Sequence, residues 1–233
     1  MAEFGVELVG WTPPPWPGPM ALTGRYARLE PMTPGHAAAL FAANRADDAI
    51  WDYLPYGPFA TEAEYAAWVT RMAGKPDPLF FAVTDLERGA PGGVASLMRI
   101  APEAGSIEVG HICYAPALQR TRAASEAIFL FADWVFRAGY RRFEWKCNAL
   151  NRASRRAAER FGFSFEGVFR NHMVVKGRNR DTAWFAMTDG DWACLKPAWE
   201  AWLDPGNFDE AGRQRRGLGE LTAGCRVASD PGA

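Results

Sequence analysis

The apolar positions of the chain repeat every second residue in some segments and about every 3.6 residues in others, which predicts both strands and helices. Strands are expected over RYARLEPM, LFFAVTD, GGVASLMRI, SIEVGHICYA, RRFEWKCNA, FSFEGVFRNHMVV and DTAWFAM, with KGRNR joining the last two. Helices are expected over PGHAAALFAANRA, TEAEYAAWVTRMAG, RAASEAIFLFADWVFRAG and NRASRRAAERFG. Thr33, Thr61 and Asn151 stand where caps of three of these helices are expected, since threonine and asparagine favour that position.

The connections between the strands predict how they pair. LFFAVTD, GGVASLMRI and SIEVGHICYA are separated by turn residues, which favours an antiparallel meander. The connection from SIEVGHICYA to RRFEWKCNA contains a helix and has the length of a βαβ crossover, so these two strands are expected to be parallel. The pattern therefore predicts an α/β (α+β) fold with a mixed, twisted, mostly antiparallel sheet flanked by helices.

The length of 233 residues suits one domain with irregular ends. Residues 1–23 include WTPPPWPG, whose prolines favour an extended arm over a helix or a central strand. Residues 24–203 carry the periodic segments and form the expected domain. Residues 204–233 are rich in glycine and charge, which indicates an irregular, loosely held C-terminal tail.

Composition excludes several classes of function. A net charge of -1 argues against a nucleic-acid partner, because proteins that neutralise phosphates usually carry a basic excess. No stretch approaches the ~20 apolar residues of a membrane span. The four cysteines form no CxxC pair, and the pattern indicates a reducing, cytoplasmic location. The three histidines lie far apart, so no metal site is expected.

The segment QRTRAA follows a predicted strand and opens a predicted helix. The first N–H groups of a helix lack partners and the helix dipole adds partial positive charge, so this position can bind an anion. Ala123 and Ala124 are small enough to let a ligand approach the backbone, and Arg120 and Arg122 can add charged contacts to a pyrophosphate. Alternatively, both arginines are solvated residues at an ordinary helix start.

The order of the elements and four motifs resemble the GNAT acetyltransferase superfamily, especially its RimJ/RimL-like branch, over Gly24 to Trp202. QRTRAA is similar to the Q/R-x-x-G-x-G/A loop, with Gln119 first, Ala124 last, and Arg122 where glycine is usual. NRASRRAAERFGF resembles the segment beside pantetheine, FRNHMVVKGRNRDTAWFAM the paired last strands, and WDYLPYGPF the aromatic loop near the acceptor.

This resemblance implies acetyl-CoA as cosubstrate, bound where the two parallel strands splay apart. The expected cofactor residues are Ile112, Cys113, Tyr114, Gln119, Arg120, Thr121, Arg122, Ala123, Ala124, Asn151 and Ser154. Gly110 is compatible with the bulge that often begins the splay. Asn151 and Ser154 also have a structural interpretation, as the cap and first turn of a helix.

Acetyl transfer needs an amine that loses a proton, a donor to the developing oxyanion and in some enzymes an acid for the thiolate. Many superfamily members use a tyrosine as that acid, and Ala158 stands at the corresponding position. Glu108 is the expected base and Ser154 the expected donor to sulfur; alternatively, Glu108 is an ordinary surface glutamate at a strand edge. His111, His172 and Tyr114 are alternatives, and Cys113 would be needed only for a covalent acetyl-enzyme.

The expected function is N-acetylation of a primary amine by direct attack in a ternary complex. A protein or peptide α-amine suits a site without a strong general base, because it is neutral more often than a lysine at neutral pH. An α-amine titrates near ~7.7 to 8.0 and a lysine near ~10.4. Other relatives modify small amines, so a small-molecule acceptor is also left open. Trp51, Tyr53, Tyr56 and His172 are the expected acceptor-binding residues; alternatively, the aromatic residues of this loop only close the core, as they often do between helices. The alternative is a catalytically silent acyl-CoA-binding or scaffold protein of the same fold, and a homodimer is left open.

Overall fold

The computed structural model describes residues 3–233. Its eight-stranded sheet has the order β1-β2-β3-β4-β5-β6-β8-β7. The strands are β1 (Leu22–Thr23), β2 (Ala27–Pro31), β3 (Leu79–Asp85), β4 (Ala90–Ala101), β5 (Ser106–Tyr114), β6 (Arg142–Asn148), β7 (Ser164–Val175) and β8 (Arg178–Thr188). The pair β5 and β6 is parallel and the other neighbours are antiparallel, which confirms the mixed, mostly antiparallel fold.

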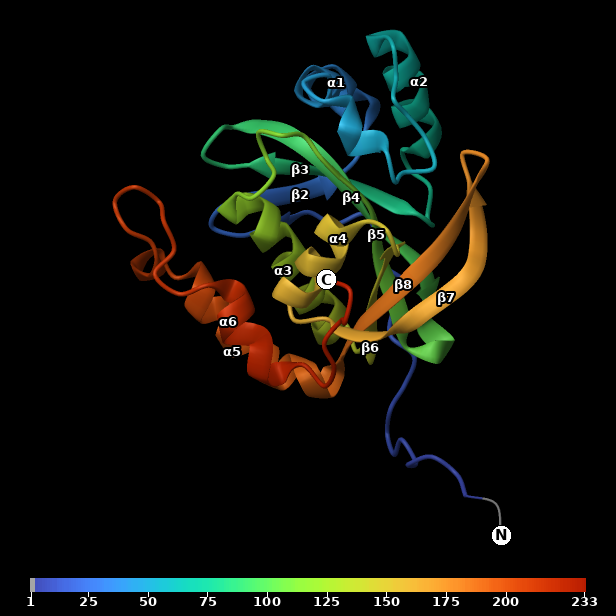
Figure 1. The fold of residues 1–233 in the computed structure, drawn as a ribbon, viewed down its shortest axis with the longest axis vertical. Helices are drawn as coiled ribbons and strands as arrows, with labels where there is room; N and C mark the ends of the chain where they lie inside the picture. The colour runs from blue at the N-terminus through green and yellow to red at the C-terminus, as the bar shows by residue number, and fades with distance from the viewer. Residues whose placement is uncertain (1–2) are drawn as a thin grey trace.

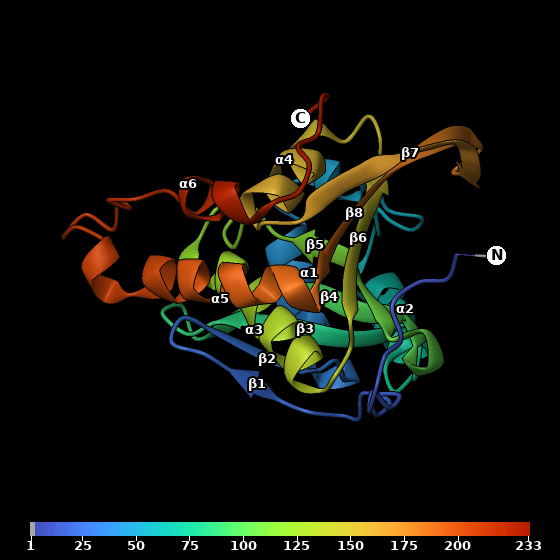
Figure 2. The same cartoon turned by 90° about the horizontal axis from the view of Figure 1, so that it is seen from below.

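The helices cover both faces of the sheet (Figures 1 and 2). They are α1 (Ala37–Asn44), α2 (Glu62–Met72), α3 (Arg122–Arg137), α4 (Arg152–Arg160), α5 (Asp189–Leu203) and α6 (Leu218–Thr222). Short 3-10 helices lie at Pro34–His36, Asp48–Trp51, Pro102–Ala104, Pro205–Asn207 and Ala223–Cys225. None of the helices in the described residues is both long enough and apolar enough to cross a membrane.

Two hydrophobic clusters lie on opposite faces of the sheet. The larger cluster joins α3 and α5 to inward residues such as Phe81, Val109 and Phe143. The smaller cluster joins α1 and α2 to residues such as Phe80 and Cys113. Because side chains alternate along a strand, the neighbouring residues Phe80 and Phe81 serve different layers.

Helix starts follow the predicted caps in two cases. Thr61 Oγ1 accepts from Glu64 N at 3.2 Å, and Asn151 Oδ1 accepts from Ser154 N at 3.0 Å. Thr33 precedes a 3-10 turn, and the α-helix begins later, at Ala37. Thr121 caps α3 by accepting from Ala124 N at 3.0 Å, so α3 begins within QRTRAA.

The prediction that KGRNR joins the last two strands is wrong in extent. Only Lys176 and Gly177 form the turn, and Arg178 to Arg180 belong to β8, which pairs with β7 from Val175↔Arg178 onward. The resulting hairpin extends away from the rest of the sheet (Figures 1 and 2). A glycine with φ of 73° at position 177 explains why two residues are enough for this turn.

The N-terminal segment lacks regular structure up to β1, and its first described residues extend away from the body in Figure 1. Its proline-rich part nevertheless packs on the domain, since Pro14 and Pro17 are buried. Tyr140 OH donates to Pro15 O at 3.1 Å, and Trp11 Nε1 donates to Gly139 O at 3.3 Å. The segment is therefore fixed against the C-terminal end of α3.

The C-terminal segment is irregular but firmly attached, unlike the loosely held tail that its composition suggests. Cys225 forms a disulfide with Cys194 of α5. Asp230 is buried and pairs with Arg155 of α4, with Arg155 Nε donating to Oδ2 at 2.6 Å. The chain end accordingly lies beside α4 in Figures 1 and 2. The disulfide also weakens the interpretation of the cysteine pattern as that of a reducing compartment, because disulfides are rare there.

Candidate active site

A cavity of about 1380 Å³ follows the gap between β5 and β6. The two strands pair only from Ser106↔Arg142 to Val109↔Trp145, and beyond these residues they separate. At one end, here called the α3 end, the lining residues are Tyr26, Arg122, Arg160, Trp202, Phe208 and Gln214. At the other, here called the hairpin end, they are Tyr53, Met98, Arg99, Glu108, Lys146, Met173, Val175 and Arg180.

A β-bulge in β5 shapes the middle of this cavity. His111 and Ile112 together lie opposite Ala95 of β4, and His111 has a φ of 51°. Because the bulge inserts one residue, the alternation of side chains reverses there, and His111 shares the face of Glu108. The predicted bulge is confirmed, one residue after Gly110. A Cβ at Gly110 would meet Met98 Sδ at 2.3 Å, so a larger residue here requires the Met98 side chain to move.

The α3 end presents unpaired backbone donors. The N–H groups of Arg120, Arg122 and Ala123 have no acceptor within residues 3–233. Arg120 has a φ of 60°, which turns the loop toward the start of α3. All three residues line the cavity. The helix dipole of the 16-residue α3 adds partial positive charge there, so this end can bind an anion.

Gln119 and Tyr114 complete the wall next to α3. Gln119 Nε2 donates to Tyr114 O at 2.9 Å and so ties the end of β5 to the loop. The Tyr114 side chain lines the cavity, and its hydroxyl is buried without a partner in the described residues. Burial raises the pKa of Tyr114 well above its ordinary value, so this hydroxyl is a neutral donor.

Two arginines at the α3 end are held by aromatic rings. The guanidinium of Arg122 lies 4.6 Å from the ring centre of Tyr26 and 5.0 Å from that of Phe208, and 3.5 Å from Glu87 Oε2. Arg160 was missed as a site residue, because an arginine on a short helix usually faces water. It lines the cavity, donates to Ser125 Oγ at 3.0 Å, and has its pKa lowered by burial.

Glu108 belongs to a buried network of charges at the hairpin end. Its Oε2 accepts from Lys146 Nζ at 2.9 Å and from Arg99 Nη1 at 3.0 Å. Its Oε1 accepts no hydrogen bond from the described residues and lies 3.5 Å from where a Cβ of residue 110 would be. One carboxylate oxygen is therefore fixed by two cations, while the other is available to a ligand in the cavity.

His111 lies near Glu108 on the same face of β5. Its ring stacks on Tyr56 with 5.5 Å between ring centres and contacts Phe80 at 5.1 Å. Burial, and then the charges of Arg99 and Arg180, lower the pKa of His111 to about 4. The imidazole is therefore neutral at neutral pH.

Ser154 lines the cavity next to Trp145 and Cys147. Its Oγ accepts from Trp145 Nε1 at 3.0 Å, and its own hydrogen can donate to a ligand or to Cys147, whose pKa burial raises and this hydrogen bond lowers. Asn151 lines the cavity as well, but its Oδ1 is engaged as the cap of α4. Ala158 is fully buried and is not among the cavity residues, whereas Ala157 is. Neither alanine can supply an acid.

The expected acceptor residues are only partly brought together. Tyr53 lines the cavity, and its hydroxyl donates to Leu150 O at 3.3 Å. Trp51 and Tyr56 do not line it, because both are packed in the aromatic cluster under α2. Tyr56 contributes indirectly, by supporting the ring of His111.

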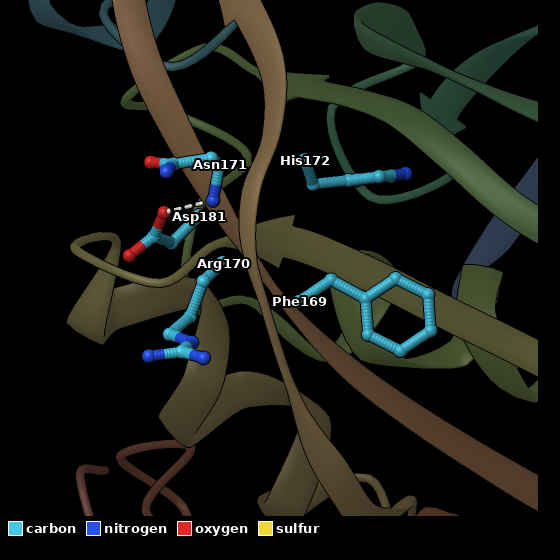
Figure 3. A pocket seen from close by; sticks show the side chains of 5 residues that line it. All are labelled: Phe169, Arg170, Asn171, His172 and Asp181. Atoms are coloured by element: carbon cyan, nitrogen blue, oxygen red, sulfur yellow. Dashed lines mark hydrogen bonds between the residues drawn. The ribbon is translucent and has the colours of Figure 1, made fainter.

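His172 lies on the hairpin in a separate, shallow hollow of about 720 Å³ (Figure 3). Its Nδ1 is 2.9 Å from Thr182 Oγ1, and its ring meets Phe169 edge to face. Figure 3 shows Asn171 and Asp181 at this hollow, with Asn171 N donating to Asp181 Oδ1 at 2.7 Å. The structure thus places His172 outside the large cavity.

The Cys113 thiol and possible metal ligands are the remaining chemical groups of the site. Burial raises the pKa of the Cys113 thiol to about 12, so it is protonated at neutral pH and a poor nucleophile. No group of three or more His, Cys, Asp or Glu side chains in residues 3–233 could hold a metal ion.

Comparison with known proteins identifies the class. The acetyltransferase (GNAT) domain profile matches residues 27–164. The chain is similar to a GCN5-related N-acetyltransferase from Brucella melitensis, with 50% identity, coverage of 93% of this chain and 100% of that chain, and a TM-score of 0.90. The chain therefore belongs to the GNAT acetyltransferase family and is an acyltransferase.

Two further structures extend the comparison. A probable acetyltransferase of the GNAT family from Chromobacterium violaceum is 40% identical, with coverage of 83% of this chain and 98% of that chain and a TM-score of 0.77. The microcin C7 self-immunity acetyltransferase MccE, in complex with acetyl-CoA and AMP, shares the fold at 17% identity, with coverage of 71% and 93% and a TM-score of 0.64. A search of curated protein sequences found no significant match.

Proposed function

We propose that this acyltransferase moves the acetyl group of acetyl-CoA to a primary amine by direct attack in a ternary complex. The observation that carries the proposal is the cavity itself. It joins three unpaired N–H groups at the start of α3, through the gap between β5 and β6, to a buried carboxylate at Glu108. An anionic cofactor therefore has hydrogen-bond donors at one end of the cavity, and an acceptor amine has the free oxygen of Glu108 at the other.

The cofactor is proposed to bind with its pyrophosphate on the loop from Gln119 to Ala124, where Thr121 caps the helix and the N–H groups of Arg120, Arg122 and Ala123 are free. Arg160 adds a second cation at this end. Pantetheine is proposed to lie along Ile112 to Tyr114, whose edge toward β6 is unpaired after the splay. MccE, which shares the fold, is an example of a structure that contains acetyl-CoA.

In the transfer step the amine nitrogen forms a bond to the acetyl carbon and the carbon–sulfur bond breaks. The nitrogen loses one proton to Glu108, directly or through a water, and the thiolate takes up that proton by way of water to become the CoA thiol, which returns Glu108 to its carboxylate form. Ser154 is proposed to donate a hydrogen bond to the sulfur. Cys113 takes no part, because a protonated, buried thiol does not compete with the amine as nucleophile.

The acceptor is proposed to be an α-amine, including that of a protein or peptide N-terminus, as in the RimJ/RimL-like branch. A cytoplasmic location, a homodimer and the absence of a nucleic-acid or membrane partner remain predictions from the sequence. The alternative of a silent acyl-CoA-binding or scaffold protein is favoured by one observation, that neither Ala157 nor Ala158 can act as an acid.

Calorimetric titration with acetyl-CoA and with CoA tests the proposal, using native protein and the Arg122→Glu variant. Reversing this charge should weaken binding by roughly 10-fold or more, because the variant places a carboxylate beside the pyrophosphate. Arg45→Glu is the matched control, since Arg45 is exposed and does not line the cavity. Equal affinity in Arg122→Glu and native protein contradicts the cofactor placement, and binding without thiol release for any amine supports the silent alternative.

A further inference from the structure

Three cations near Glu108 are each paired with a carboxylate, whereas a fourth, Arg180, is not. Arg142 pairs with Glu166, with Nη1 to Oε1 at 2.7 Å. Lys146 Nζ pairs with Glu144 Oε2 at 2.5 Å, and Arg99 Nη1 pairs with Glu108 Oε2 at 3.0 Å. Asp77 is a further carboxylate in this region, and it accepts from the backbone N–H groups of Arg99 and Ile100 at 3.0 and 3.2 Å. Arg180 lines the same end of the cavity and has no carboxylate within 4.0 Å in residues 3–233.

The Arg180 guanidinium makes a single side-chain hydrogen bond, from Nε to Thr182 Oγ1 at 3.2 Å. The residue is partly buried on β8. Burial lowers its pKa, the nearby Cys147 and Glu108 act in the opposite direction, and the charge of Arg99 acts with burial. A guanidinium that has lost part of its hydration and has no counter-ion is costly to the protein. Its terminal nitrogens are free to donate to an anion that enters the cavity.

The position of Arg180 separates this anion from the cofactor. The pyrophosphate is assigned to the α3 end, whereas Arg180 lies at the hairpin end with Met98, Met173 and Val175. Glu108 and Arg99 are near enough to Arg180 to influence its titration, and His111 is influenced by Arg180 in turn. An anion at Arg180 is thus a neighbour of the proposed base.

We propose that the acceptor is a primary amine that also carries a carboxylate, and that Arg180 binds this carboxylate while the amine faces Glu108. The inference rests on the proposed acetyltransferase function and names the class of its acceptor. Arg180 is a specificity residue here, since it contacts the substrate away from the reacting nitrogen. The carboxylate can belong to an α-amino acid or to an acidic side chain near a peptide N-terminus.

The cations also favour the reactive form of the acceptor. Positive charge beside an amine disfavours its ammonium form, and only the neutral amine attacks the thioester. At His111 burial is the largest cause that disfavours the charged form, Arg99 and Arg180 act in the same direction, and Asp77 opposes them. The acceptor carboxylate is drawn to Arg180 by the same charge, so the orientation with the amine toward Glu108 is the favoured one.

Matched acceptors test the inference through thiol release. One pair is an α-amino acid and its carboxamide, and the other is a pair of C-terminally amidated peptides with Glu or Gln as second residue. If the acceptor is an amino acid, the first pair should show the difference, and if it is a peptide, the second pair should. In that pair the kcat/KM of the native protein should be roughly 10- to 100-fold higher for the member with the carboxylate, as expected for a charged hydrogen-bonded contact. A preference in one pair alone identifies the source of the carboxylate.

In Arg180→Gln the preference should fall close to one, mainly through a higher KM for the carboxylate member. The control is Arg178→Gln, an exposed residue of the same strand that does not line the cavity, and it should keep the native ratio. The inference is overturned if native protein shows no preference in either pair, or if Arg180→Gln keeps it. If acetyl transfer to both members of a pair is still observed in those cases, the proposed acetyltransferase function is not contradicted.

Binding gives a readout that does not depend on turnover. Native protein saturated with CoA is titrated with an N-acetyl amino acid and with its carboxamide, which correspond to the two products. The carboxylate should bind roughly 10-fold or more tightly in native protein and in Arg178→Gln, and lose this advantage in Arg180→Gln. Equal binding of the two products by the native protein contradicts the inference even if the enzyme is slow, whereas absent turnover with intact acetyl-CoA binding contradicts the proposed function instead.

Discussion

Lys146 Nζ lies 2.9 Å from Glu108 Oε2, and the exposed fractions of the two side chains are only 4% and 5%. The pair joins the two strands that separate a little further on, and Lys146 also lies 3.9 Å from the ring centre of Trp184. An ion pair this well buried stabilises little on balance, since desolvation opposes the attraction. Its consequence is positional, because it fixes the carboxylate of Glu108 where β5 and β6 begin to part.

Glu108→Gln should lower kcat by roughly 100-fold or more, the range of a lost general base, while the affinity for acetyl-CoA stays native. The variant should remain folded, because Lys146 keeps Glu144 as a partner and the roughly 3–5 kcal/mol cost of an orphaned buried charge is avoided. The measurement is steady-state thiol release together with calorimetry. Glu103→Gln, in the exposed turn before β5, is the control, and an unchanged kcat in Glu108→Gln would remove Glu108 from the mechanism.

The free N–H groups at α3 can be tested separately from the arginine charge. Thr121 is extended, with φ -86° and ψ 165°, which is the conformation required before a proline, and Arg122 is the first residue of the helix. Arg122→Pro therefore removes one donor without breaking the helix, while Arg122→Ala removes only the side chain. Acetyl-CoA should bind Arg122→Pro roughly 5-fold or more weakly than Arg122→Ala, and equal dissociation constants would show that this N–H is not used.

Local patterns predicted the elements well, for identifiable reasons. β3 has the predicted bounds, Leu79–Asp85, because it is a short apolar run between turn residues. The crossover length likewise predicted the parallel pair of β5 and β6, and the family motif predicted the loop at Gln119. These features depend on neighbouring residues or on one connection, which a sequence displays directly.

The contacts between segments far apart in the sequence could not be predicted from local patterns. The insertion of β8 between β6 and β7 and the pairing of Arg155 with Asp230 depend on which distant surfaces fit together. Arg160 and Arg180 look like ordinary exposed arginines in the sequence, and only the cavity distinguishes them. The aromatic loop gave the opposite error. Its composition suggests a wall around a ligand, but Trp51 is packed in the core.

Reduction of the Cys194–Cys225 disulfide should destabilise the protein. The bond closes a loop with a sequence separation of 31 residues and attaches the C-terminal segment to α5. The chain-entropy estimate for a loop of this size is about 3–4 kcal/mol. Thermal unfolding of native protein should shift to lower temperature on addition of a reductant, and Cys225→Ser should show no such shift. Native protein that melts at one temperature under both conditions would indicate that the bond does not form in solution.

The titration of His111 predicts how stability depends on pH. Its pKa of about 4 in the folded protein lies below the ordinary value near ~6.5, because the ring is buried and near Arg99 and Arg180. The unfolded chain therefore binds this proton more readily. The contribution is complete above a pH of about 6.5 and is lost progressively as the pH falls toward about 4, with a total of up to about 3 kcal/mol.

His111→Asn is the variant that isolates this effect, because asparagine tolerates the φ of 51° that the bulge imposes and does not titrate. Urea unfolding at about pH 7.5 and about pH 5 gives the free energy of unfolding for both proteins. Native protein should lose more of it than His111→Asn does, by about 1–2 kcal/mol, since pH 5 lies inside the window. His36→Asn is the control, because His36 lies in the turn Pro34–His36, outside both hydrophobic clusters, where its Nδ1 accepts from Thr33 N at 3.0 Å. If native protein and His111→Asn lose equal stability between the two pH values, the imidazole is not buried neutral, and its stacking on Tyr56 does not persist in solution.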